Sequence, residues 1–236
     1  DLRELKIDPV KLKKIVAIGI PAGLQGMVFS ISNVLIQSSV NSFGSQVMAG
    51  NTAASNIEGF VYNAMNAVYQ TSLSFTSQNM GAHDLNRVNR GVNTALGIGV
   101  VYSIVSFLIL RVADKPLIGL FLESDQTEIM ANAQSFIFWN SVFYIPLAVL
   151  IIYRYTIQGL GYSGLAMFAG VAEMVARAMV GFWFVPLWGY FAACIANPVA
   201  WFFACFFLIP AYFVVRKRLQ KEKDIEKAHD AQAAKA

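Results

Sequence analysis

Long apolar stretches alternate with short polar ones along this chain of 236 residues. An apolar run of roughly 20 residues is long enough to cross a bilayer as a helix. Six such runs can be marked, the second of them unusually polar. Helices that are apolar on all faces would leave a soluble bundle with an apolar outer surface. The pattern therefore predicts an all-α polytopic membrane protein with six transmembrane helices, at about residues 15–41, 46–75, 91–112, 130–157, 163–186 and 189–215.

Composition supports this prediction. Only 14% of the residues are charged and the mean hydropathy is +0.53, whereas soluble domains carry about 25% charged residues. The charges gather at the two ends of the chain and in short loops. Residues 1–14 are expected to form a basic linker and residues 216–236 a charged, helix-prone tail.

The distribution of Lys and Arg predicts the orientation. Basic residues are concentrated in the first 14 residues, in the loop after the second span (Arg87 and Arg90) and in the tail. With six spans these three places fall on one side, which the positive-inside rule assigns to the cytoplasm. Both termini are therefore expected to be cytoplasmic. The loop between spans three and four, on the opposite side, is acidic on balance because it carries Asp114, Glu123, Asp125 and Glu128 against Arg111 and Lys115.

The second span contains a polar stripe around Glu58. Steps of three or four residues place Asn51, Ser55, Glu58, Tyr62, Asn66 and Tyr69 on one side of a helix, with Asn63 and Gln70 beside them. Such a stripe cannot favourably face lipid, since unsatisfied polar groups there cost several kcal/mol each. We expect it to face other helices or water.

Three roles remain open for Glu58. A carboxyl buried without a basic partner could bind and release a proton, or it could coordinate a cation together with Asn and Tyr oxygens. It could also belong to a hydrogen-bonding network between helices. The residues predicted to bind substrate or coupling ion are Glu58, Tyr62, Asn63 and Asn66 in span two, with Gln25 and Asn33 in span one.

Span five contains Glu173 and Arg177, which share one helix face at a spacing of four residues and can form an ion pair. This pair is predicted either to lock span five to its neighbours or to act as a mobile gate. Arg154 lies near the end of span four, where its long stem is expected to extend to the membrane surface.

No enzyme is predicted. The sequence lacks HExxH and GxSxG motifs and paired aspartates within the spans. Adjacent residues rarely direct their side chains at one target, so His83 and Asp84 make a poor catalytic pair. Instead Gly81 can end one helix and Asp84 can cap the next. Cys194 and Cys205 are interpreted as packing residues, and no metal site is expected.

Four short motifs in order resemble the multidrug and toxic compound extrusion (MATE) family. They are GIPAGLQ at 19–25, NSFG at 41–44, SQNMGAHDLNR at 77–87 and IQGLGYS at 157–163. Together they cover most of the chain, and they resemble the C-terminal half of such a transporter. One departure concerns the coupling ion, because several members have an acidic residue where this chain has Phe29.

The resemblance implies one lobe of a twelve-helix, two-lobe transporter in which a proton or sodium gradient drives export of drug-like or metabolic organic compounds. The implied partners are a small organic substrate, cationic in some cases, the lipid bilayer and an N-terminal six-helix lobe, since the chain opens at Asp1 rather than Met. No nucleic acid is expected, and no cofactor apart from the transported H⁺ or Na⁺. The implied location is the plasma membrane, which in a bacterium is the inner membrane.

Two alternatives stay open. A lipid-linked saccharide flippase of the same superfamily would share the two-lobe architecture, but its phosphate-bearing substrates would favour a strongly cationic cavity. Apart from Arg111 at the end of the third span, only Arg154 and Arg177 lie within the predicted spans. A membrane subunit without transport activity is the other alternative.

Overall fold

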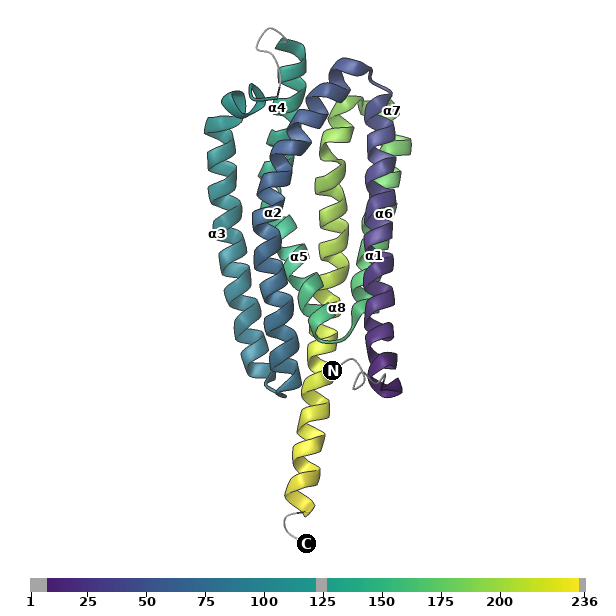
Figure 1. Ribbon diagram of the computed structural model, residues 1–236, viewed down its shortest axis with the longest axis vertical. Helices are drawn as coiled ribbons and strands as arrows, with labels where there is room; N and C mark the ends of the chain where they lie inside the picture. Colours follow the sequence, from purple (N-terminus) through teal and green to yellow (C-terminus); the bar gives the residue numbers. More distant parts are fainter. Residues whose placement is uncertain (1–7, 122–126, 234–236) are drawn as a thin grey trace, which may run out of the picture.

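The computed structural model describes residues 8–121 and 127–233, and this part of the chain is helical apart from short turns (Figure 1). The predicted positions Glu123 and Asp125 lie outside the described residues, as does the first half of the basic linker. The helices are α1 (Pro9–Asn41), α2 (Ser45–Gly81), α3 (Leu85–Ile118), α4 (Thr127–Val142), α5 (Tyr144–Gly159), α6 (Ser163–Met179), the π-helical segment η2 (Val180–Phe184), α7 (Val185–Trp188) and α8 (Tyr190–Ala233).

Four helical segments in the described residues are long and apolar enough to cross a membrane: Pro9–Asn41, Leu85–Ile118, Ser163–Trp188 and Tyr190–Ile225. The bent pair α4 and α5 makes a fifth when it is counted as one span. The second predicted span, α2, does not meet this criterion: it has 37 residues and runs alongside α3, but its polar side chains lower its hydropathy. The fold is thus the predicted all-α membrane bundle, with a span count of four to five by composition.

The fourth predicted span is broken. Helices α4 and α5 meet at Phe143 with a bend of 54°. Pro146 lies in the first turn of α5, where its missing N–H and its ring prevent a continuous helix from forming across the junction. The break is hydrogen-bonded to α8, because the Asn140 side chain donates to the Cys194 carbonyl at 3.3 Å and Cys205 donates to the Pro146 carbonyl at 3.3 Å.

A second irregularity ends the fifth predicted span. After Met179 the helix widens into η2 and then continues as the short α7, which contains Pro186. Local widening of this kind accommodates a residue that cannot join the regular hydrogen-bond ladder. The chain then turns at Gly189, whose φ of 62° suits glycine, and enters α8.

Two apolar clusters hold the bundle together. The larger one joins residues of α2, α3, α4, α5, α6 and α8, with Trp201, Leu147 and Ile152 among its fully buried members. The smaller one joins α1 to η2, α7 and α8 through Ile36, Val40 and Val180. Helix α1 packs chiefly on α6 and stands at the edge of the bundle (Figure 1), so most of its side chains remain exposed.

Gly50 permits the close approach of α2 and α4. A Cβ atom at this position would lie 2.7 Å from the Ile129 carbonyl oxygen, which is backbone and cannot move aside. We expect Gly50→Ala to lower the free energy of unfolding by about 1–3 kcal/mol, the range for overpacked sites. Gly59→Ala in the same helix meets no atom within 4 Å and should leave stability equal or slightly higher. Thermal unfolding of both variants in detergent checks this, and equal losses would contradict it.

The turn between α2 and α3 follows the prediction in most respects. Helix α2 ends at Gly81, and the Asp84 carboxylate caps α3 by accepting a hydrogen bond from the Arg87 amide at 3.0 Å. The left-handed residue is His83, with φ of 56°, rather than a glycine. His83 is exposed, and its carbonyl accepts a hydrogen bond from Lys223 of α8 at 2.7 Å.

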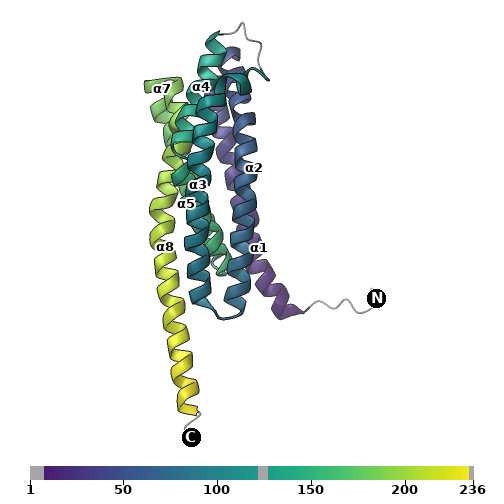
Figure 2. The same ribbon diagram turned by 90° about the vertical axis from the view of Figure 1, so that its left-hand side faces the viewer.

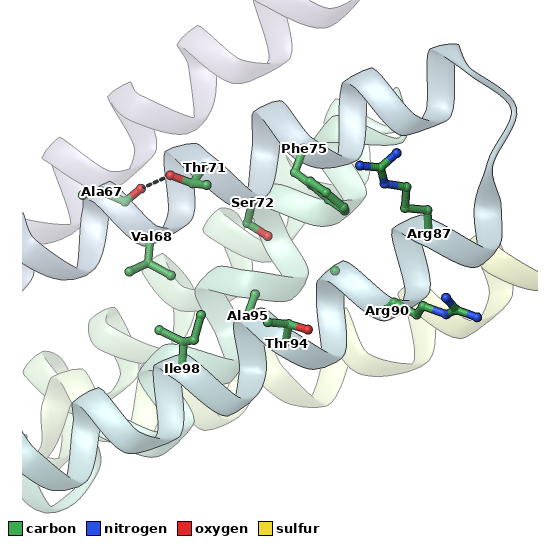
Figure 3. A pocket seen from close by; sticks show the side chains of 11 residues that line it. Ala67, Val68, Thr71, Ser72, Phe75, Arg87, Arg90, Thr94, Ala95 and Ile98 are labelled. Carbon is green, nitrogen blue, oxygen red and sulfur yellow. Dashed lines mark hydrogen bonds between the residues drawn. The ribbon is translucent and has the colours of Figure 1, made fainter.

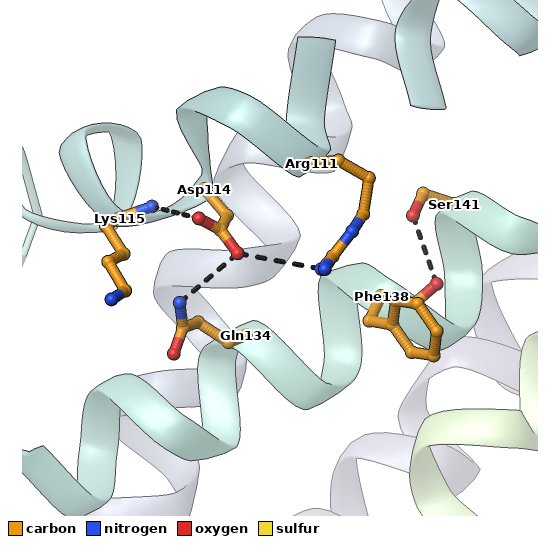
Figure 4. Close-up of polar contacts among 6 residues, drawn as sticks. All are labelled: Arg111, Asp114, Lys115, Gln134, Phe138 and Ser141. Carbon is orange, nitrogen blue, oxygen red and sulfur yellow. Dashed lines mark hydrogen bonds and ion pairs between the residues drawn. The ribbon is translucent and has the colours of Figure 1, made fainter. Parts of the chain in front are cut away.

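The basic residues gather at one end of the bundle. The start of α1, the turn between α2 and α3 and the outer part of α8 point the same way in both ribbon views (Figures 1 and 2). The tail from residue 216 continues α8 as far as Ala233. At the opposite end Asp114 of α3 accepts a hydrogen bond from Gln134 of α4 at 3.2 Å, while Arg111 lies over the Phe138 ring (Figure 4).

Candidate functional site

A cleft of about 520 Å³ opens between α1 and the helices α2, α5 and α6. It forms where α1 is held by α6 and diverges from α2. Gln25 of α1 lies beside Gly170 of α6, where an added Cβ atom would be 3.5 Å from the Gln25 Cγ, an ordinary van der Waals distance. The polar and aromatic groups that line the cleft are Gln25, Phe29, Tyr62, Asn66, Tyr69, Gln70, Arg154, Tyr155, Gln158 and Glu173.

Three of the predicted binding residues therefore meet in one place: Gln25, Tyr62 and Asn66. Asn63 is exposed and does not line the cleft, because it lies one position along α2 from Tyr62 and points elsewhere. Asn33 is likewise exposed on α1, two turns beyond Gln25, and does not line the cleft. The structure thus separates the six predicted residues into three in the cleft wall, two outside it and Glu58.

An ion cluster forms part of the cleft wall, because Arg154 and Glu173 line the cleft. Glu173 of α6 forms an ion pair with Arg154 of α5, and its other carboxylate oxygen lies 3.8 Å from the Arg177 guanidinium. Arg177 also donates a hydrogen bond to Ser32 of α1 at 3.0 Å, and its guanidinium lies 5.3 Å from the centre of the Phe29 ring. The cluster links three helices, and its three charged side chains are at least nine-tenths buried.

The expected position of Arg154 was wrong. Its side chain does not extend to the membrane surface but is buried against Glu173, which lies 19 positions later on the next helix. The predicted partner of Glu173, Arg177, is present at a longer distance. Burial of a lone guanidinium is costly, so pairing with a carboxylate across the two helices is more stable than either charge alone.

Glu58 occupies a separate, buried position on α2, with 9% of its surface exposed. The Tyr144 hydroxyl of α5 lies next to this carboxyl, but neither Glu58 Oε1 nor Tyr144 Oη makes a hydrogen bond within ordinary limits. Among the described side chains, none forms an ion pair with Glu58. Tyr62 lies one turn along α2 from Glu58 and lines the cleft together with Arg154.

The rest of the polar stripe on α2 divides between helix contacts and the cleft. Asn51 is buried and accepts a hydrogen bond from Tyr190 of α8 at 3.3 Å, and Tyr69 is buried in a stacked arrangement with Tyr155 at 5.9 Å. Asn66 and Gln70 face the cleft. These members of the stripe avoid lipid by these two means, whereas Ser55 is exposed and does not line the cleft. Within the described residues no three His, Cys, Asp or Glu side chains come together as a metal site.

Fold and site together describe a helical membrane bundle with a cleft that contains buried charges, the arrangement of a membrane transporter. The family model described as MatE matches residues 21–183, more than half of the chain. The chain belongs to the MatE family, whose members are transporters and not enzymes.

Two curated relatives from Bacillus subtilis (strain 168) are similar in sequence. The probable multidrug resistance protein YoeA is 22% identical over 130 residues, which cover 55% of this chain and 28% of YoeA. The probable multidrug resistance protein YpnP is 27% identical over 169 residues, which cover 72% of this chain and 36% of YpnP. The match thus spans about a third of the length of these relatives.

Solved structures share the fold. The outward-facing conformation of a multidrug resistance MATE family transporter of the MOP superfamily superposes with a TM-score of 0.81 at 18% identity, covering 95% of this chain and 50% of that one. A MOP superfamily transporter from Pyrococcus furiosus gives a TM-score of 0.80 at 16% identity, covering 94% and 50%. Nearly all of this chain superposes on half of each solved transporter. The chain therefore has the fold of one lobe of a two-lobe transporter.

Proposed function

We propose that the chain forms the C-terminal lobe of a cation-coupled antiporter that exports drug-like or metabolic organic compounds. The observation that carries this proposal is the cleft between α1 and α2, whose wall combines amide, hydroxyl and aromatic groups. Binding sites for organic molecules are largely apolar with a few polar groups that fix orientation. Phe29, Tyr62 and Tyr155 offer ring faces on which an organic cation can also stack.

Coupling to an ion gradient is assigned to Glu58. An acidic group inside a membrane bundle is costly and is usually functional, and this carboxyl has no basic partner in the described part of the chain. A bound H⁺ or Na⁺ would neutralise it. The neighbouring Tyr62 connects this position to the cleft, so neutralisation of Glu58 can change how the substrate is held. No cofactor beyond the transported ion is proposed.

The remaining parts of the proposal concern placement. The family and the charge distribution support a plasma membrane, such as a bacterial inner membrane, with the basic end of the bundle and both termini in the cytoplasm. An N-terminal lobe of similar fold would complete the cavity, since the solved transporters have twice the length matched here. The small organic substrate would cross between the two lobes.

The charge of the cleft gives no support to a lipid-linked saccharide flippase. Arg154 is the only arginine or lysine among the residues that line the cleft in the described part of the chain, and Glu173 pairs with it there. A phosphate-bearing substrate would need an excess of positive charge that this wall does not offer.

Transport of a fluorescent organic cation in cells that express the protein tests the proposal. A protonophore collapses the proton gradient and a sodium ionophore collapses the sodium gradient. One of these two treatments by itself should stop efflux, because a single gradient is expected to drive it. Efflux that continues when both gradients are absent would overturn cation coupling. Glu222→Gln, an exposed change in the tail helix, should transport like the parent protein and serves as the control.

A further inference from the structure

A groove separate from the cleft lies between α2 and α3, with a volume of about 530 Å³. Its walls come from Val68, Thr71 and Phe75 of α2 and from Ala95 and Ile98 of α3 (Figure 3). The exposed lining is mainly apolar. Arg87 and Arg90 stand at the end nearest the turn between the two helices, beyond Phe75.

Among the side chains that the structure describes, neither arginine has an acidic partner within 4 Å. The nearest carboxylate in sequence, Asp84, is directed to the Arg87 backbone amide as the cap of α3. Arg87 instead lies over the Phe75 ring at 5.8 Å, and Arg90 is exposed. By contrast Arg111, Arg154, Arg177 and Arg218 each have a carboxylate within 4 Å. Two exposed guanidinium groups three positions apart thus form an unneutralised pair.

The groove has the length of one lipid tail. From Arg87 to Ile98 the helix advances about 16 Å at 1.5 Å per residue, close to half of the roughly 30 Å hydrocarbon core of a bilayer. At its far end Ile98 is 51% exposed, and the exposed apolar side chains of α3 continue with Val101, Ile104 and Val105. The arginines therefore lie at headgroup level when the apolar floor lies in one leaflet.

We propose that this groove binds an anionic glycerophospholipid, with one acyl chain along Val68, Phe75 and Ile98 and the phosphate on Arg87 and Arg90. Guanidinium groups bind phosphate by paired, charge-assisted hydrogen bonds. The apolar floor of the groove can hold an acyl chain, so the groove should bind a phospholipid in preference to a free phosphate. This site is independent of the export proposal, because it shares no lining residue with the cleft.

Native mass spectrometry tests the proposal. The protein is purified from its membrane in mild detergent, and the spectra report both the lipid that remains bound and the binding of added phosphatidylglycerol. Arg87→Gln with Arg90→Gln should weaken phosphatidylglycerol binding by about 25-fold, since each basic residue at an anionic headgroup contributes about fivefold. Lys11→Gln with Lys13→Gln removes the same charge from α1 at the same end and should leave binding unchanged.

Two further measurements distinguish a bound lipid from attraction by charge alone and from a site for free phosphate. Ile98→Trp fills the groove without changing charge and should also release phosphatidylglycerol. Glycerol phosphate, which has no acyl chain, should not compete. Equal losses in the arginine and lysine variants, competition by glycerol phosphate, or unchanged binding in Ile98→Trp would each overturn the proposal, as would unchanged binding after both arginines are replaced.

Discussion

Replacement of Glu173 by glutamine is expected to destabilise the protein by about 3–5 kcal/mol, the cost of removing one partner from a buried ion pair. Glu173 is the only carboxylate within 4 Å of Arg154 or Arg177 in the described part of the chain. Without its charge, two guanidinium groups would remain buried side by side. Both would lose their compensation and would repel one another, and the contact between α5 and α6 would weaken.

The measurement is thermal unfolding in detergent, followed by tryptophan fluorescence, together with the folded fraction after size-exclusion chromatography. Glu222→Gln is a matched control, because Glu222 also forms a pair with an arginine four residues away but at an exposed position of α8. Exposed pairs contribute little, so this variant should unfold like the parent. Similar behaviour of the two variants would show that water reaches the Glu173 cluster and that the pairing is not structural.

The double replacement of Arg154 and Glu173 by leucine separates pairing from simple burial. If Glu173→Gln fails because an unpaired charge is left at Arg154, removal of both groups should recover part of the lost stability, since apolar residues of similar size often replace a buried pair without loss. Recovery is expected to be incomplete because Arg177 keeps only Ser32 and the Phe29 ring.

Helices and their order were predictable because lipid removes the alternatives. Every backbone group in a bilayer must bond internally, so apolar runs of sufficient length become helices. The cap of α3 by Asp84 was predictable for a similar local reason, since the capping bond joins residues three positions apart. The bend at Phe143 was not predicted, because a proline inside a helix, here Pro146, allows several geometries.

Contacts between helices were harder to predict. The pairing of Glu173 with Arg177 follows from one-turn spacing on a single helix. The second partner of Glu173, Arg154, lies on the preceding helix, α5. No periodicity rule connects two positions that are 19 residues apart on different helices. The same limit explains why Asn63 and Asn33 were grouped with Gln25 and Asn66, since facing the cleft depends on how α1 diverges from α2.

Replacement of Glu58 by glutamine is expected to abolish gradient-driven efflux while leaving substrate exchange intact. Glutamine has nearly the same size as glutamate and keeps a polar group beside the Tyr144 hydroxyl, but it cannot bind and release a proton or neutralise a cation. Export against a concentration gradient should therefore fall to the rate measured without a gradient. Exchange of labelled for unlabelled substrate needs no coupling ion and should continue.

The comparison of these two rates distinguishes coupling from structure. A purely structural role predicts that glutamine preserves both rates, because it keeps the contact with Tyr144. Misfolding predicts that both rates fall together. Glu58→Asp retains the carboxyl and should keep part of the driven efflux. Tyr144→Phe removes only the neighbouring hydroxyl and leaves the Glu58 carboxyl in place. Driven efflux at the parental rate in Glu58→Gln would move the coupling site out of this position, to another acidic group of the complete transporter.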